Sequence, residues 1–294
     1  MAERVELAVI GGSGFYEMPG LREIEEIQVA TPFGNPSDAI RVGTVEGRRV
    51  AFLARHGRGH RLLPSEIPQL ANVWALKSIG VRRVIGVSAV GSLREELRPR
   101  EFVVPDQLID RTSGSRASTF FGSGVVAHVA MADPFCPDLS RRVARGARTA
   151  GAAAHEGGAL VVIEGPAFGT RAESETYRRW GGAVVGMTAI PEAKLLREAE
   201  ICYGVLTAVT DYDSWKVGDS EVDAATVFAI LRENVEVSRE AIRRVVAELP
   251  SVMDECGCER ALESALVTPE EEMPAEMRRK LEPILRRRIG VEGK

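Results

Sequence analysis

Short apolar runs alternate with amphipathic stretches along most of this chain. Runs rich in β-branched residues, each followed by small or polar residues, predict strands at residues 5–10, 40–45, 49–53, 84–87, 102–104, 159–163, 183–185 and 202–209. Apolar residues at helical spacing predict helices at residues 64–77, 138–150, 171–180, 191–200 and 223–248. The alternation predicts an α/β fold, with one twisted, mixed or parallel central sheet flanked by helices.

Local signals mark several boundaries of these elements. The turn Glu46-Gly47 predicts that the strands at 40–45 and 49–53 pair as an antiparallel hairpin. Thr170 and Asp138 are the residue types that cap the first turn of a helix, and we expect each to cap the helix at its position. Residues 112–129 are rich in Ser, Gly and Thr, which predicts a long loop of the kind that is either functional or disordered.

No repeat or low-complexity linker divides the first 250 residues, so we expect one domain at 1–250. Residues 251–294 form a helical tail that contains the pair Cys256-Gly257-Cys258, alternating charges and the basic end Arg286-Arg287-Arg288. This tail is expected to pack along an edge of a subunit or to be partly mobile. A membrane or RNA role for it ranks below a solvated surface.

Composition narrows the function classes. The 294 residues are 45% hydrophobic and 27% charged, which suits a globular protein with a sizeable core. The net charge of -4 and the lack of a basic face argue against nucleic acid as a partner. No signal-peptide pattern and no apolar run of about 20 residues is visible, so we expect a cytoplasmic protein with no membrane partner.

Groups suited to anion binding follow three of the predicted strands. Ser13 lies in a glycine-rich turn that matches neither a dinucleotide fingerprint nor a P-loop. Arg55 and His56 could hold a phosphate by an Arg fork and an imidazole hydrogen bond, although a solvated basic loop explains them too. Ser88 and Ala89 end the strand at 84–87, where a purely structural turn is an equally good explanation. The convergence of three such strand ends predicts an anion site.

Two carboxylates, Asp211 and Asp213, follow the strand at 202–209. Side chains two residues apart on an extended segment share a side, so their pKa values can be pushed apart and one carboxyl kept protonated. A protonated Asp could donate to a purine ring nitrogen while a glycosidic bond breaks. The alternatives are turn chemistry and calcium ligation, and the further oxygen ligands of a calcium loop are not seen.

Ten motifs then occur in order along the chain. They are GGSGF at 11–15, TPFGNPSD at 31–38, ARHGRGH at 54–60, ANVWALK at 71–77, AVGSLREEL at 89–97, DQLIDRT at 106–112, MADPFCP at 131–137, EGPAFGTRAES at 164–174, GMTAIPEAKL at 186–195 and TDYDSW at 210–215. With these motifs the chain resembles the methylthioadenosine phosphorylase branch of the trimeric-type purine nucleoside phosphorylases, from about residue 5 to about residue 250.

The resemblance implies a role for each matched position. The family's phosphate site falls on Ser13, Arg55, His56, Ser88, Ala89 and Thr188. Met187 matches the residue that packs on the ribose, and Phe168, Asp211 and Asp213 match the purine pocket. There Asp211 would share or donate a proton at N7, and Asp213 would help hold the 6-amino group.

The resemblance also implies a 5′ pocket and an oligomer. His128 resembles a residue that reaches the 5′-methylthio end of the neighbouring subunit's site, which implies a homotrimer or a hexamer. Val227 and Phe228 correspond to apolar residues that line the same end. One departure is Gly169, where relatives often have a serine touching the base, so adenine specificity would depend more on the two aspartates.

The implied chemistry is phosphorolysis of 5′-deoxy-5′-methylthioadenosine to adenine and 5-methylthioribose 1-phosphate. Phosphate is the co-substrate, and neither a metal nor an organic cofactor is expected. A broader purine nucleoside phosphorylase that acts on adenosine, inosine or guanosine is the alternative, because a methylthio group gains only about 1–3 kcal/mol over a hydroxyl in an apolar slot. A nucleoside-binding regulator and a water-using nucleosidase are further alternatives, and neither would need the full set of phosphate-contacting residues.

The chain has four cysteines. In an ordinary cytosol four reduced thiols are the general expectation. The even count and the Cys-Gly-Cys pair, however, resemble thermophilic archaeal members, where disulfides occur inside the cell. That resemblance implies a Cys136–Cys202 bridge and a strained Cys256–Cys258 bridge. A zinc site at the Cys-Gly-Cys pair ranks lower, because the sequence shows no second ligand pair nearby.

Overall fold

The computed structural model describes residues 5–12, 18, 20–216, 224–250 and 256–288, the side chains of 224–228 and 231 excepted. Its strands are β1 Leu7–Gly11, β2 Arg22–Ile27, β3 Ile40–Val45, β4 Arg48–Ala54, β5 Arg83–Ser92, β6 Phe102–Val104, β7 Gln107–Arg111, β8 Ala154–Glu156, β9 Ala159–Ile163, β10 Gly182–Gly186 and β11 Cys202–Asp211. Its helices are α1 Gln69–Ser78, α2 Pro137–Thr149, α3 Arg171–Arg179, α4 Ala189–Glu198, α5 Ala224–Glu248, α6 Ala275–Lys280 and α7 Glu282–Leu285. Short 3-10 turns are η1 Pro64–Glu66, η2 Asp213–Trp215, η3 Cys258–Arg260 and η4 Glu270–Glu272.

The described strands form one mixed sheet, which confirms the predicted fold class. Along the main path the order is β2-β3-β4-β1-β5-β10-β9-β7, and β11 pairs with β5 and β6 while β8 pairs with β6. The central pairs β4–β1, β1–β5 and β5–β11 are parallel. The predicted hairpin is confirmed, since β3 and β4 pair antiparallel around Glu46 and Gly47, both at positive φ.

Strand β5 organises the sheet around an opening. On one edge β1 pairs with β5 up to Gly86, and on that same edge β10 pairs antiparallel from Gly91 onward. The opposite edge is covered by β11 from Arg83 to Gly91. In the described part of the chain, the edge of residues 87–90 that faces away from β11 therefore has no strand partner. This opening positions the candidate site.

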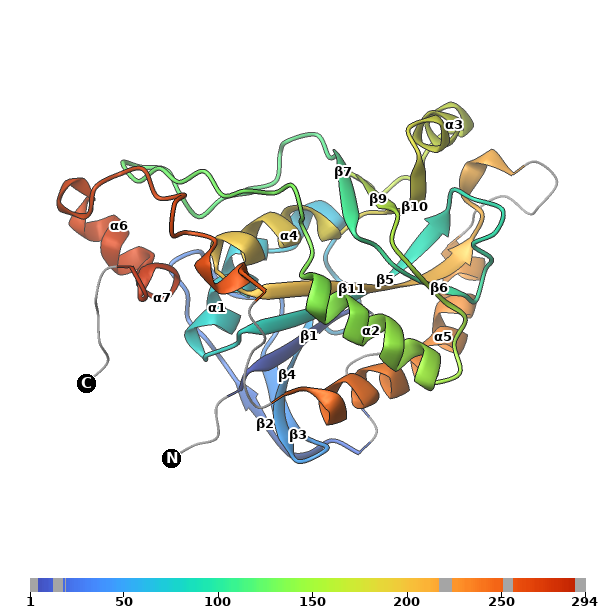
Figure 1. Ribbon diagram of the computed structural model, residues 1–294, viewed down its shortest axis with the longest axis horizontal. Helices are drawn as coiled ribbons and strands as arrows, with labels where there is room; N and C mark the ends of the chain where they lie inside the picture. The colour runs from blue at the N-terminus through green and yellow to red at the C-terminus, as the bar shows by residue number, and fades with distance from the viewer. Residues whose placement is uncertain (1–4, 13–17, 19, 217–223, 251–255, 289–294) are drawn as a thin grey trace.

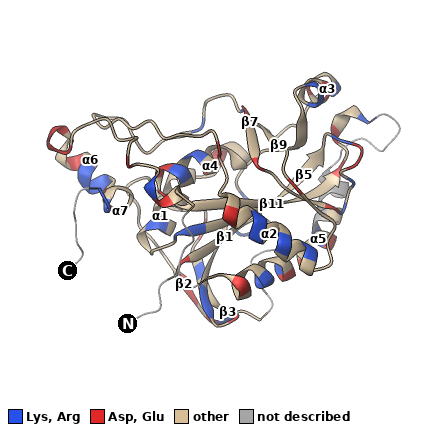
Figure 2. Cartoon of the chain, in the orientation of Figure 1, with Lys and Arg blue, Asp and Glu red and all other residues tan. Residues whose placement is uncertain are grey.

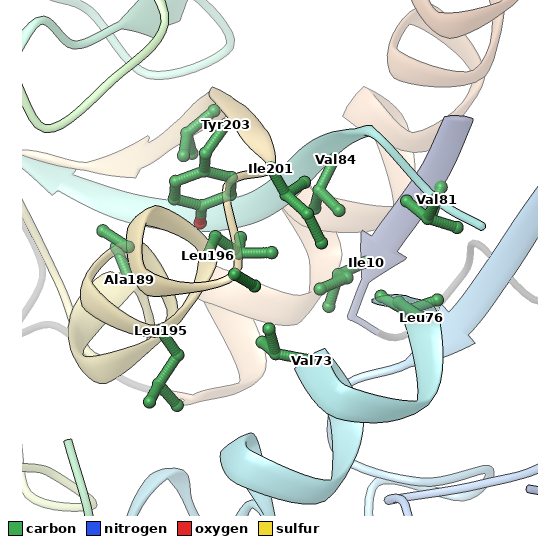
Figure 3. Close-up of a cluster of buried hydrophobic side chains, with 14 of the residues drawn as sticks. Ile10, Val73, Leu76, Val81, Val84, Ala189, Leu195, Leu196, Ile201 and Tyr203 are labelled. Atoms are coloured by element: carbon green, nitrogen blue, oxygen red, sulfur yellow. The ribbon is translucent and has the colours of Figure 1, made fainter. Parts of the chain in front are cut away.

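Helices cover both faces of the sheet, and β1 shows why. Its run LAVIG is buried throughout, and its side chains alternate between two apolar clusters. Leu7 and Val9 pack into the cluster that α2 and α5 complete, and those two helices lie side by side in Figure 1. Ala8 and Ile10 pack into the cluster that α1 and α4 complete (Figure 3). A strand that is buried on both faces reads as a continuous apolar run.

Two predicted boundaries show how local chemistry sets an element's start. Thr170 caps α3 as predicted: its hydroxyl accepts from the Glu173 N–H, and its own N–H donates to the Glu173 carboxylate at 2.7 Å. The prediction for Asp138 was wrong. Helix α2 begins one residue earlier at Pro137, whose fixed φ suits the first helical position, so Cys136 is the N-cap residue. Asp138 instead accepts from Arg142 Nε at 2.8 Å, one turn along the helix.

The described part of the tail packs on the domain. Leu262, Met277, Leu281 and Leu285 are buried in the same apolar cluster as α1 and α4. The Trp74 indole N–H of α1 donates to the Lys280 carbonyl at 2.9 Å. Figure 1 shows this segment in red beside α1. The helical patterning of the tail therefore reflects packing against α1 and α4, and the described part contains only short helices.

The predicted disulfides are not present. All four cysteines are free thiols, which corrects both Cys136–Cys202 and Cys256–Cys258. Cys202 and Cys256, which belong to different predicted pairs, have their Sγ atoms 3.3 Å apart. A disulfide needs about 2.05 Å. The pairing was inferred from the resemblance to thermophilic archaeal members, whereas in this chain the fold brings the start of β11 against the segment that follows α5.

Charge is mixed over the surface. Figure 2 shows acidic and basic residues interspersed along α2 and α5. Several form ion pairs within one helix or between the two, such as Arg142–Asp138 and Arg145–Glu248. Among the described residues, no helix is both long enough and apolar enough to cross a membrane.

Candidate functional site

The opening beside β5 leads into a cavity of about 360 Å³. Its lining comes from the carboxyl ends of several strands and the loops that follow them. The lining residues are Gly12, Arg55, His56, His60, Arg61, Leu62, Leu63, Pro64, Ser88, Ala89, Val90, Gly91, Ile163, Pro166, Phe168, Val185, Gly186, Met187, Thr188, Thr210, Asp211 and Asp213. Most of the candidates nominated from separate sequence segments therefore lie around one cavity.

Four candidates are not placed in this cavity. Ser13 lies outside the described residues, although its neighbour Gly12 lines the cavity. Val227 and Phe228 lie in α5, but their side chains are outside the described part. His128 is exposed in the loop 112–129, and its N–H donates to the Ala265 carbonyl at 2.8 Å. It does not line the cavity of its own chain.

Arg55 is more deeply engaged than the sequence suggested. Its side chain is only 2% exposed, and its Nε and Nη2 atoms donate to the two carboxylate oxygens of Glu192 at 2.9 and 3.0 Å. Nη1 donates to the Val87 carbonyl at 2.8 Å and Nη2 to the Ile10 carbonyl at 3.1 Å. The two guanidinium N–H groups that were expected to bind an anion are thus occupied by Glu192. This corrects the prediction that Arg55 holds phosphate through a bidentate pair of hydrogen bonds. Arg55 instead fixes the unpaired edge of β5 from inside the molecule.

Glu192 is a site residue that sequence reasoning missed. It is fully buried on α4, and the Tyr203 hydroxyl donates to its Oε1. Burial, together with the negative charge of Glu192, raises the pKa of Tyr203 well above its usual range. The three residues join β4, α4 and β11 beneath the cavity. The one sequence signal for such a partner is the position of Arg55 directly after a predicted buried strand. A buried cation there needs a counter-ion.

His56 presents a defined tautomer to the cavity. Its Nδ1 lies 2.8 Å from the Leu62 carbonyl oxygen, which can only accept, so we assign the proton to Nδ1. Burial lowers the pKa of His56 to about 4. The imidazole is therefore neutral near pH 7, and Nε2 is a hydrogen-bond acceptor. This corrects the expectation that the ring donates to an anion.

The other anion candidates also line the cavity. Ser88 and Ala89 lie on the part of β5 that has no strand partner on one edge. Thr188 follows β10 and precedes α4, and its hydroxyl makes no capping hydrogen bond to that helix. The loop around it is held by Arg116, which donates to the Met187 and Ile190 carbonyls at 2.7 and 2.8 Å. Sequence reasoning missed Arg116 because it lies inside the long loop 112–129.

Asp211 and Asp213 lie at the end of β11, where η2 begins. Asp211 Oδ2 accepts from the Thr210 hydroxyl at 2.7 Å, and Oδ1 accepts from the Asp213 N–H at 2.8 Å. Asp213 Oδ2 is buried and accepts no hydrogen bond from the described residues. Burial raises the pKa of both carboxyls, and for Asp213 the neighbouring Asp211 charge adds to that rise. The pair therefore suits holding a proton.

Apolar side chains complete the cavity. Met187 and Phe168 both line it, and Phe168 remains 41% exposed, which is unusual for a large apolar side chain. A Cβ built at Gly169 would meet nothing closer than 3.9 Å, so the position has room for a serine side chain. The cavity is thus lined by hydroxyls and backbone groups suited to an anion, by two carboxyls and by apolar side chains.

The class of protein follows from this architecture. A branched mixed sheet whose central strand opens into a cavity, lined by hydroxyls, backbone groups and carboxyls with raised pKa values, fits the class of nucleoside phosphorylases. The model of the phosphorylase superfamily matches residues 6–249 of this chain.

More specific relatives narrow the class. The chain is 51% identical over 279 residues to an S-methyl-5′-thioadenosine phosphorylase of Geobacter sulfurreducens, covering 95% of this chain and 97% of that protein. It is 53% identical over 278 residues to one of Chloroflexus aurantiacus, covering 95% and 96%. The chain belongs to the S-methyl-5′-thioadenosine phosphorylase family of the phosphorylase superfamily.

Solved structures agree with this assignment. A methylthioadenosine phosphorylase sourced from an Antarctic soil metagenomic library superposes with a TM-score of 0.92 at 46% identity, covering 96% of this chain and 99% of that one. A methylthioadenosine phosphorylase from Schistosoma mansoni in complex with adenine superposes with a TM-score of 0.80 at 36% identity, covering 89% and 97%.

Proposed function

We propose that this protein catalyses the phosphorolysis of S-methyl-5′-thioadenosine to adenine and 5-methylthioribose 1-phosphate. The observation that carries the proposal is the shared cavity, in which Ser88 and Thr188 lie with Asp211 and Asp213 around one space of nucleoside size. The names of the relatives support the same substrate. The reaction uses inorganic phosphate as co-substrate and needs no metal or organic cofactor at the cavity.

Phosphate binds at the opening beside β5. Backbone N–H groups and hydroxyls of Ser88, Ala89 and Thr188 donate to its oxygens, with Ser13 from the glycine-rich turn as a further donor. His56 Nε2, an acceptor in the neutral ring, takes the hydrogen bond of the phosphate P–OH group. Arg55 holds this arrangement through Val87 and Glu192 and adds positive charge beneath it. An anion held in line with the sugar can stabilise and then capture the developing cation.

The base side of the cavity activates the leaving group. As the glycosidic bond lengthens, the sugar becomes oxocarbenium-like and negative charge moves onto the purine. An Asp whose pKa is raised by burial can share a proton with N7 at that moment. The resemblance to the family assigns N7 to Asp211 and the 6-amino group to Asp213. Both oxygens of Asp211 accept hydrogen bonds from within the protein, whereas Asp213 Oδ2 accepts none from the described residues, so Asp213 carries the stronger claim to direct contact with the base.

Met187 and Phe168 bind the remaining parts of the nucleoside. Met187 packs on the ribose, and Phe168 covers the purine ring. The 5′-methylthio group faces Val227, Phe228 and the partner subunit's His128, which requires at least a homotrimer. The exposed position of His128, outside its own chain's cavity, supports this arrangement.

Steady-state kinetics test the proposal. Methylthioadenosine should have a higher kcat/KM than adenosine or inosine, and turnover should require added phosphate. The solved Schistosoma relative described as an adenosine/methylthioadenosine phosphorylase favours some activity on adenosine as a second candidate. A clear preference for inosine, or turnover that is independent of phosphate, would contradict the proposal.

A further inference from the structure

All four cysteines of the chain meet at one place, away from the cavity. Cys136 precedes α2, Cys202 is the first residue of β11, and Cys256 and Cys258 lie in the segment after α5. Their Sγ atoms all lie within 4.8 Å of one another. None of the four lines the cavity described above. Three separate segments of the chain thus bring four thiols together.

The size of the cluster is that of a tetrahedral metal site. Zinc binds thiolate sulfur at about 2.3 Å, so four sulfurs around one zinc ion lie about 3.8 Å apart. The Sγ atoms here are 3.3 Å apart at Cys202 and Cys256 and no more than 4.8 Å apart for any pair. Small side-chain adjustments would bring all four onto one ion. The second ligand pair that the sequence did not reveal is Cys136 with Cys202.

The backbone fixes the thiols before any metal binds. The Cys136 N–H donates to the Tyr203 carbonyl at 2.7 Å, and the Cys202 N–H donates to the Arg82 carbonyl at 2.9 Å. Gly257 has φ +75°, a left-handed conformation that reverses the chain between Cys256 and Cys258 and suits glycine. The four ligands are therefore held by main-chain geometry of three segments.

The surroundings suit a closed structural site. Cys136, Cys202 and Cys258 are buried in the apolar cluster that Leu139 and Val143 of α2 help to form. Four thiolates and one Zn²⁺ carry a net charge of -2, which needs compensation in an apolar setting. The Arg197 guanidinium supplies one positive charge, with Nη1 3.7 Å from Cys258 Sγ. Hydrogen bonds to ligand sulfurs are a regular part of metal sites.

We propose that Cys136, Cys202, Cys256 and Cys258 bind one structural Zn²⁺ ion. Each thiol loses its proton to solvent as its sulfur binds, and no redox step occurs. Soft thiolate ligands in a tetrahedral, fully ligated set favour zinc, and the metal takes no part in catalysis. The ion joins the segment after α5 to β11 and α2. The tail that follows, from Leu262 onward, is thereby anchored where it packs on α1 and α4.

Metal analysis of the full-length protein tests this inference. The protein is purified under reducing conditions without chelator, and zinc is measured by mass spectrometry; we expect about one ion per chain. Replacing zinc with Co²⁺ should give the strong visible d–d and thiolate charge-transfer bands of tetrahedral cobalt. Cys136→Ser and Cys258→Ser should each lower metal affinity by roughly tenfold or more. The matched control His155→Asn changes a metal-binding residue type outside the cluster and should retain zinc.

The wild-type protein alone can overturn the proposal, so the test does not depend on how the variants fold. Intact mass with and without alkylation shows whether the isolated cysteines are thiols, metal-bound or disulfides. Protein that is metal-free as isolated and, after reduction, gives no tetrahedral Co²⁺ spectrum contradicts the site. Iron in place of zinc contradicts the assignment of the metal. Metal-free protein that gives the cobalt spectrum after reduction supports the site.

Discussion

At the scale of single residues, the carboxyl side of the cavity contains an oxygen that the protein itself does not use. Asp213 Oδ2 is buried without a hydrogen-bond partner among the described residues, and burial raises the pKa of the carboxyl. A buried acceptor without a partner costs stability unless a ligand supplies one. Under the proposed function, the base of the nucleoside supplies that partner.

Asp213→Asn tests that role. The amide keeps the size of the side chain but can no longer share a proton, so kcat for methylthioadenosine should fall by about 10²- to 10⁴-fold while the protein stays folded. Asp138→Asn, a change at a carboxylate on α2 that pairs with Arg142, is the matched control and should leave kcat near wild type. Equal rates for both variants would remove Asp213 from the mechanism.

Gly169 offers a gain-of-function test. Because nothing lies within 3.9 Å of a Cβ at this position, Gly169→Ser should fold normally. A serine hydroxyl that reaches the base would add one hydrogen bond of about 0.5–1.5 kcal/mol, so KM for methylthioadenosine should fall by a few-fold. An unchanged KM, with an unchanged melting temperature, would show that the hydroxyl does not reach the base.

His56 gives a pH dependence of known sign. Its pKa is about 4 in the folded protein, below the usual value of 6.5, and burial lowers the pKa of His60 in the same direction. Between these pH values the unfolded chain binds more protons than the folded one, so stability rises with pH and is lost as pH falls from 6.5 to about 4. The loss from His56 is on the order of 3 kcal/mol.

Urea unfolding at several pH values measures this effect. In wild type the free energy of unfolding should decrease steadily across the window from pH 6.5 to 4. In His56→Asn the decrease should be shallower, since the asparagine does not titrate. Identical slopes in the two proteins would mean that His56 is solvated enough to be protonated in the folded state.

At the scale of elements, helix α4 supports the anion side from below. Its Glu192 pairs with Arg55, the residue after β4, and Arg55 in turn donates to the carbonyl of Val87 on β5. The opening between β1 and β10 is therefore held by a buried ion pair and not by strand pairing. Such a pair contributes little net stability, but removing one partner leaves a buried charge without compensation.

Glu192→Ala should destabilise the protein by about 3–5 kcal/mol, because Arg55 loses its counter-ion in a buried position. The comparison is Glu175→Ala on α3, where the carboxylate is half exposed and pairs weakly with Arg178. That change should stay within about 0.5 kcal/mol of wild type. Equal destabilisation of the two variants in urea unfolding would contradict the buried pair's role.

The sequence predicted elements well where local chemistry decides them. The strands at 40–45, 102–104 and 159–163 and the Thr170 cap match the structure because alternation and capping act over a few residues. It missed β2, whose residues Arg22–Ile27 are mostly exposed and so carry no burial signal. It ended the central strand near residue 88, whereas β5 continues to Ser92 because β11 and β10 pair with it.

For the site, the sequence identified side chains and missed their partners. Arg55, His56, Ser88, Asp211 and Asp213 follow strands, so the rule for strand ends in α/β sheets was enough to gather them. Glu192 and Arg116 were not identified from the sequence, because their contacts join residues far apart in the chain and no local pattern encodes them. The four cysteines illustrate the same limit: their pairing depends on which segments the fold brings together.

At the scale of the whole molecule, the account requires an oligomer. The 5′ end of the nucleoside is assigned to the partner subunit's His128, which lies on an exposed loop. Light scattering should therefore give the mass of a trimer or a multiple of it. His128→Ala should raise KM for methylthioadenosine more than for adenosine, with no change in melting temperature. A monomer with full activity would contradict this assignment.

The central claim is that one cavity holds phosphate on one side of a single sugar and, on the other side, a protonatable carboxyl that binds the base. Phosphorus NMR of a reaction with methylthioadenosine and inorganic phosphate tests it most directly, because it reports where the phosphate goes. The account predicts that a sugar 1-phosphate signal grows in step with the release of adenine. Release of adenine with the phosphate signal unchanged would mean that water is the nucleophile, and it would contradict the account.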